Sequence, residues 1–200
     1  MEPRIITAPT VEAVSEDELK SQIGIASSDT AWDTHLALIQ TAARSFYERR
    51  VSRTMHETEL EIYRDHFPGT DRIELPRATP LISITTVAYK DSDGDETVWA
   101  AANYIADTTS PVGAVVAAYG VSWPSFTAYP VNPIRVRYKA GTETASPIDE
   151  VNTMDKFAIL QVGSAFFENR DGWKYEAGVV ELTDAGLLAL IDMRLSEWVF

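Results

Sequence analysis

The sequence contains no cysteine, and it has no apolar run long enough to cross a membrane. The first absence excludes disulfides, thiolate zinc sites, iron–sulfur clusters and cysteine nucleophiles. The second excludes a membrane-spanning helix, which needs about 20 consecutive apolar residues. The amino-terminal residues also lack the basic and apolar segments of an export signal, so we expect synthesis in the cytoplasm.

Basic residues are scarce relative to acidic ones. Lys and Arg number 17 against 30 Asp and Glu, which gives a formal net charge of −13. The compact basic groups are Arg44 with Arg49, Arg50 and Arg53, and the strand-like set Arg135, Arg137 and Lys139. A duplex-binding protein needs a cationic face to neutralise phosphates, so a nucleic-acid-gripping function is not expected. The acidic surplus is interpreted as a solubilising surface.

Apolar residues make up 45% of the 200, enough for a packed core. A capping box at Ser15 predicts a short helix to about residue 23. An apolar stripe from Trp32 to Phe46 predicts a second helix over about 30–50. Arg44, Arg49 and Arg50 lie in its second half, where cations oppose the negative end of the helix dipole.

The middle of the chain has a period of two, typical of strands. Thr58, Leu60 and Ile62 alternate with three glutamates, which predicts a half-buried strand with an acidic outer face. Further strands are expected near residues 73–75, 81–90, 97–100, 104–106, 112–118 and 134–140. Helical spacing returns after Pro147, with a buried helix from about residue 151 and a last helix that begins at Thr183.

These elements predict an α+β fold, in which a small helical bundle from the amino- and carboxyl-terminal helices carries an inserted antiparallel β subdomain. We expect a single domain, residues 1–200, with helices over 1–53, a β-rich insertion over 54–146 and helices over 147–200.

Catalytic and cofactor motifs are not found. The run from Asp91 to Glu96 lacks the glycine and glutamate spacing of a calcium loop and is interpreted as a hairpin turn. A weak cation site is the alternative interpretation. His35, His56 and His66 are too far apart in sequence to place two metal ligands on one helical face. Nucleophile elbows and phosphate loops are also absent, so we expect no enzyme activity, no cofactor and no metal.

Aromatic residues gather in the β region, and an apolar run ends the chain. Most of these side chains are expected to fill the core, but some are candidates for contacts with other molecules. The candidates form two groups, one of Arg49, Arg50, Trp123 and Tyr129 and one of Arg194, Trp198, Val199 and Phe200.

The order of these segments resembles the head-tail connector proteins of tailed bacteriophages, also called adaptor or head-completion proteins. The resemblance covers nearly the whole chain and is carried by residues 12–15, 38–44, 65–68, 73–77, 80–81, 88–91, 94, 122–124, 136–141 and 167–170. The sequence departs from the family at Val51-Ser52-Arg53, where the second helix often closes with Thr-Gly, and at the acidic Asp149-Glu150.

The resemblance implies a structural protein of the virion, made in the host bacterial cytoplasm and seated at the head-tail junction. It implies an oligomeric ring, a dodecamer in the particle, that binds the portal protein on one side and a stopper or tail-completion protein on the other. The candidate portal interface is then the group Arg194, Trp198, Val199 and Phe200, and the candidate inter-subunit or neck interface is the group Arg49, Arg50, Trp123 and Tyr129. DNA would pass through the lumen without specific binding, and no membrane is involved. The alternatives are another neck protein, such as a stopper or tail-completion protein, and a carbohydrate-binding or hydrolytic module that uses Trp99 and Trp123.

Overall fold

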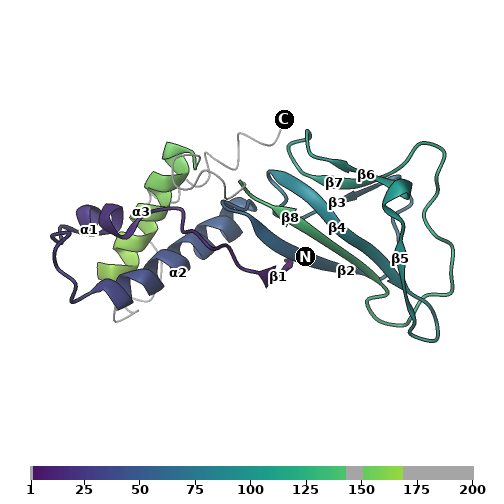
Figure 1. Cartoon of the computed structure of the whole chain (residues 1–200), viewed down its shortest axis with the longest axis horizontal. Helices are drawn as coiled ribbons and strands as arrows, with labels where there is room; N and C mark the ends of the chain where they lie inside the picture. The colour runs from purple at the N-terminus through teal and green to yellow at the C-terminus, as the bar shows by residue number, and fades with distance from the viewer. Residues whose placement is uncertain (1, 143–150, 169–200) are drawn as a thin grey trace, which may run out of the picture. The chain divides into compact units, whose positions relative to one another are not determined.

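The computed structural model describes residues 2–142 and 151–168 and confirms an α+β fold, with helices and antiparallel sheets in two compact units (Figure 1). The β unit comprises residues 2–10 and 52–142, and the helical unit comprises residues 11–51 and 151–168. The helix predicted from Thr183 lies outside the described residues.

Three helices form the helical unit: α1 (Glu16–Ile23), α2 (Asp33–Val51) and α3 (Thr153–Glu168). The predicted capping box is confirmed, since Ser15 Oγ accepts from the Glu18 amide at 3.1 Å and the Ser15 amide donates to Glu18 Oε2 at 2.6 Å. The buried side chains of Leu19, Leu36 and Ile39 form the centre of the unit. None of these three helices combines the length and the apolarity needed to span a bilayer.

A polar network lies within the same helical unit. Arg44 is only 5% exposed, and it donates from Nε to Glu12 Oε2 at 2.7 Å and from Nη1 to Glu48 Oε2 at 3.1 Å. Tyr47 donates its hydroxyl to Asp155 Oδ1 at 2.7 Å, which joins α2 to α3. Arg44 lies in the second half of α2, as expected, but it is buried and its charge is balanced by carboxylates, which the sequence did not indicate.

The β unit contains two antiparallel sheets. Its elements are β1 (Arg4–Thr7), β2 (Thr58–Arg64), β3 (Arg72–Glu74), β4 (Leu81–Lys90), β5 (Glu96–Trp99), the short 3-10 helix η1 (Ala101–Asn103), β6 (Tyr104–Asp107), β7 (Ala114–Ala117) and β8 (Ile134–Ala140). The five-stranded sheet has the order β1-β2-β8-β4-β5, and the three-stranded sheet has the order β3-β7-β6. The first strand comes from the amino-terminal segment, which pairs with β2 through Ile5 opposite Leu60.

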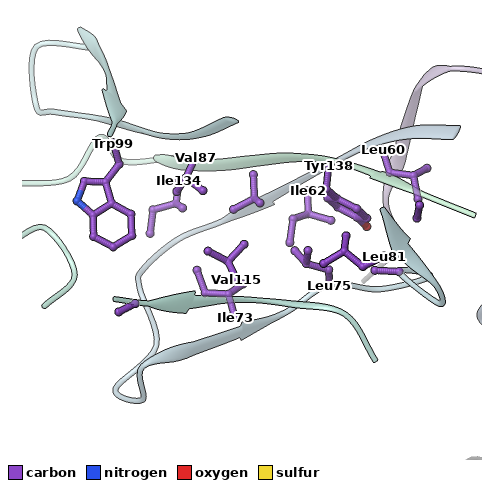
Figure 2. Packing of buried hydrophobic residues seen from close by; sticks show 14 residues of the cluster. Leu60, Ile62, Ile73, Leu75, Leu81, Val87, Trp99, Val115, Ile134 and Tyr138 are labelled. Carbon is purple, nitrogen blue, oxygen red and sulfur yellow. The ribbon is translucent and has the colours of Figure 1, made fainter. Parts of the chain in front are cut away.

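The core of the β unit lies between the two sheets. Figure 2 shows Ile73 and Val115 of the smaller sheet pointing toward Val87 and Ile134 of the larger one. Tyr138 is fully buried among them, and its hydroxyl donates to the Pro76 carbonyl at 2.6 Å. Burial raises the pKa of Tyr138. Alternate residues of β2 and β8 face this core, as the period of two predicts.

Ser52 follows the last residue of α2 and has φ 53°, in the left-handed region. Glycine commonly occupies this position after a helix because it has no Cβ to clash there. The connector proteins often end this helix with Thr-Gly. Here a serine takes the place after the helix, in a conformation that strains an L side chain.

We expect Ser52→Gly to raise the free energy of unfolding by roughly 0.5–1 kcal/mol, because it removes the left-handed strain. The matched control is Ser45→Gly in the interior of α2, which should lower the same quantity by about 0.5 kcal/mol. Urea unfolding followed by circular dichroism measures both. Effects of the same sign at the two positions would contradict the conclusion that the left-handed conformation strains Ser52.

Candidate interaction surface

The outer face of the five-stranded sheet carries charges that are paired with one another. Glu61 is 2% exposed, and its Oε2 accepts from Arg137 Nη2 at 2.8 Å and from Arg135 Nη1 at 3.3 Å. Its Oε1 accepts from the Tyr63 hydroxyl at 2.7 Å. The prediction of a solvent-facing acidic row was wrong at Glu61, because β8 places Arg137 directly opposite it in register and the arginines cover the carboxylate.

The other cations of β8 are also paired within the unit. Arg135 contacts Glu96 of β5, and Lys139 Nζ lies 2.7 Å from Glu57 Oε1. The basic set that stands out in the sequence therefore neutralises carboxylates of neighbouring strands. This face consequently presents little net charge to a partner.

The pKa of Glu61 reflects these contacts. Burial alone would raise it, but the hydrogen bonds from Tyr63 and Arg137 and the positive charge of Arg137 outweigh burial and lower the pKa. The hydrogen bond from Arg135 likewise lowers the pKa of Glu96. Both carboxylates therefore stabilise the folded state in their ionised form.

An aromatic cluster covers one part of the core of the β unit. Trp123 stacks on Phe67 with ring centroids 5.0 Å apart and an interplanar angle of 9°, and it lies 5.0 Å from Trp99. Its Nε1 donates to the Thr70 carbonyl at 2.7 Å. The cluster also includes Tyr89, Tyr104 and Phe126. The indole faces are thus occupied by other rings of the same unit.

The segment between β7 and β8, residues 118–133, is a long loop attached to the scaffold at several points. Besides the Trp123 indole, the Tyr129 amide donates to the Lys90 carbonyl at 3.2 Å and the Asn132 amide to Asp65 Oδ1 at 3.3 Å. The loop exposes Tyr119 fully, before the first of these attachments, and Val131 by 62%. A loop held on a rigid sheet with exposed apolar side chains is a common form of binding surface.

The loop lacks charge along its whole length. No charged residue stands between Asp107 and Arg135, in a chain in which 24% of residues are charged. Charged side chains are depleted in the centres of protein interfaces. The absence of charge over this run is visible in the sequence, but it matches no known motif. Because of it, Tyr119 and Val131 join the candidate surface. We call this surface, residues 118–133, the neutral loop.

The predicted interface residues fall in different places. Tyr129 is 41% exposed on the neutral loop, next to Gly94, and Trp123 is half-buried in the aromatic cluster. Arg49 and Arg50 are exposed in the last turn of α2, within the other unit. Arg194, Trp198, Val199 and Phe200 lie outside the described residues. The roles of all eight stay predictions.

The run from Asp91 to Glu96 forms the predicted hairpin between β4 and β5. Gly94 has φ 89°, and Asp91 Oδ1 accepts from the amides of Asp93 and Asp95. The side chain of Asp91 therefore closes the turn. Over residues 2–142 and 151–168, no three His, Cys, Asp or Glu side chains are grouped as a metal site.

We expect Glu61→Gln to lower the free energy of unfolding by about 1–3 kcal/mol at pH 7, because it removes the charge that Arg135 and Arg137 share. The folded-state pKa of Glu61 is depressed below 4.5, so its contribution is present at neutral pH and is lost as the pH falls through the folded-state value. The difference between wild type and variant should therefore shrink in acid. Urea unfolding at pH 7 and pH 3 measures it, with Glu59→Gln as the control that should change stability by less than about 0.5 kcal/mol.

Trp123 and Tyr119 should respond differently to truncation. We expect Trp123→Ala to lower the free energy of unfolding by roughly 2–4 kcal/mol, because it empties space in the aromatic cluster. Tyr119→Ala should change it by less than about 0.5 kcal/mol, because the side chain is fully exposed. Urea unfolding followed by circular dichroism measures both. Equal losses of stability would contradict the view that Trp123 holds the loop on the core and that Tyr119 only faces solvent.

Comparison with known proteins identifies the fold. No protein-family model and no curated protein matches the chain. Among solved structures, a chain in the neck of an empty GTA particle, computed with C6 symmetry, matches with a TM-score of 0.75 and 18% identity, over 97% of this chain and 95% of that one. A chain in the virion of the native gene transfer agent (GTA) particle matches with a TM-score of 0.72 and 19% identity, over 99% and 95%.

A third match is a chain in the neck of the native GTA particle, computed with C12 symmetry, with a TM-score of 0.70 and 18% identity over 97% of this chain and 94% of that one. The alignments span nearly the full length of both partners, so they concern the whole architecture and not one shared motif. These matches confirm the resemblance to phage head-tail connectors at the level of the fold. This chain has the fold of chains found in the neck and virion of gene transfer agent particles.

Proposed function

We propose that this protein is a structural component of the neck of a tailed phage or phage-like particle, where it acts as a head-tail adaptor. The observation that carries the proposal is the full-length match to neck chains, over 97% of this chain and 95% of the matched one. In this role the protein joins the portal to the next neck or tail protein by shape and contact. It performs no bond-making or bond-breaking of its own.

The proposed assembly is a ring of copies, a dodecamer in the particle. Two of the matched necks were computed with C6 and C12 symmetry, which supports a cyclic arrangement. DNA would pass through the lumen without specific binding, since a chain of net charge −13 repels the phosphate backbone and lets it slide. The pairing of Arg135, Arg137 and Lys139 with carboxylates fits this role.

Two surfaces are assigned to the ring's neighbours. The neutral loop, which includes Tyr129, is proposed to contact the adjacent neck or tail protein because it is exposed, apolar and uncharged. The carboxyl-terminal residues Arg194, Trp198, Val199 and Phe200 are proposed to contact the portal. The alternative of a glycan platform is not favoured, because Trp99 is 7% exposed and Trp123 is covered by Phe67.

Cryo-electron microscopy of the particle that contains the protein tests the proposal. We expect density for a ring of copies between the portal and the tail, and its loss from particles assembled without the gene. Density at another site in the particle, or heads that still attach tails when the protein is missing, would refute the adaptor role.

A further inference from the structure

Helix α2 exposes a face that carries no charge over residues 34–45, before the exposed Arg49 of the last turn. Its outward residues are small or apolar, and Leu38 among them is 67% exposed. The face is made by Thr34, Ala37, Leu38, Thr41, Ala42 and the half-buried Ser45. Glu12 borders it, since Thr41 donates to Glu12 Oε1 at 2.9 Å, but its charge is paired with Arg44. We call these six residues the α2 face.

Helix α3 exposes a second face of different shape that is uncharged over residues 154–164, before the exposed Glu168 at the end of the helix. Met154 and Phe157 are each 44% exposed, and the same stripe continues through Gln161 and Ser164 at helical spacing. We call these four residues the α3 face. Its amino-terminal half is a ridge of two large side chains, whereas the α2 face is flat apart from Leu38.

The two faces point to opposite sides of the helical unit. The inward side of α2 contacts the inward side of α3, since Tyr47 bonds Asp155 and Ile39 lies beside Gly163. These contacts run in opposite directions along the two helices, which makes them antiparallel. Each copy therefore presents the α2 face on one side and the α3 face on the other.

Charge limits which surfaces of two copies can meet. Every copy has a net charge of −13, and like charges brought together at an interface cost several kcal/mol. On the α2 face and the α3 face this repulsion is absent. Apolar side chains as exposed as Leu38 and Phe157 also lose water favourably when they are covered.

From these observations we propose that the α2 face of one copy binds the α3 face of the next copy, and that this contact closes the ring. The inference rests on the proposed function and deepens it by assigning the contact between copies. Two different surfaces on opposite sides make a head-to-tail interface, which closes into a ring when the rotation between copies divides a full turn.

Side-chain sizes on the two faces are complementary. The proposal places the ring axis parallel to the two helices, because rotation about such an axis keeps each residue at its own height. Helices α2 and α3 of neighbouring copies then meet antiparallel, as they do within one unit. Phe157 then lies opposite Ala42 and Ser45, and Leu38 lies opposite Ser164. Each large side chain meets small ones, which allows the helices to pack closely.

Cysteine cross-linking tests the contact directly, because the native chain has no thiol. Ala42→Cys and Gln161→Cys lie at matching heights and leave Leu38 and Phe157 in place. In the full-length protein, assembled in solution or in the particle, a short bismaleimide should link the double variant into a ladder of oligomers. Each single variant should give no cross-linked product on a denaturing gel, since a head-to-tail contact never brings two copies of residue 42, or two copies of residue 161, together.

A charge on the α2 face provides the second measurement. Leu38→Glu should weaken ring formation at least tenfold, measured by mass photometry across a concentration series. Ile105→Glu, at a position that is 59% exposed on β6, is the matched control and should assemble like wild type. Circular dichroism melting checks that both variants fold.

The outcomes separate the interface from the proposed function. Wild-type rings together with a double variant that does not cross-link, or with Leu38→Glu rings of normal stability, overturn the interface and leave the adaptor role standing. Cross-linking of the single variants overturns the head-to-tail geometry. A large loss of thermal stability in Phe157→Glu would show that the same copy covers the α3 face, which also overturns the contact. Absence of wild-type rings from both solution and particle overturns the proposed function itself.

Discussion

Charge constrains where this chain can contact another molecule. The chain has a net charge of −13, and placing acidic surfaces of two molecules against each other is costly. Among the described residues, the α2 face, the α3 face and the neutral loop are surfaces where a contact avoids this cost. The carboxylates of the β sheet that lie nearest to the arginines of β8 are paired with them.

Buried ion pairs connect segments that are distant in the sequence within each of the two units. Arg44 is held between Glu12 and Glu48, and Glu61 lies between two arginines of β8. Pairs of this kind contribute little net stability, because desolvation offsets their attraction, but breaking one leaves a buried charge that is costly. Each pair therefore disfavours arrangements of its unit in which the partners are separated.

Local elements were predictable from the sequence because their signals lie within a few residues. The capping box at Ser15, the helix that contains Leu36 and the strand alternation at Leu60 each depend on spacings of two to four residues. Long-range partners were not predictable. Glu61 was taken for a surface residue because its arginines are more than seventy positions away along the chain, and Arg44 was taken for a dipole partner because Glu12 belongs to another segment.

The α+β composition, the approximate bounds of most elements, the acidic character and the resemblance to head-tail connectors all follow from the order of the residues. The folded arrangement was needed to see which charges are buried and paired, and that Trp123 packs into the aromatic cluster whereas Tyr119 is exposed to solvent. It was also needed to see that α2 and α3 turn uncharged faces in opposite directions. The reason is physical: periodicity reports which side of an element is apolar, whereas strand register and helix packing determine what each side chain meets.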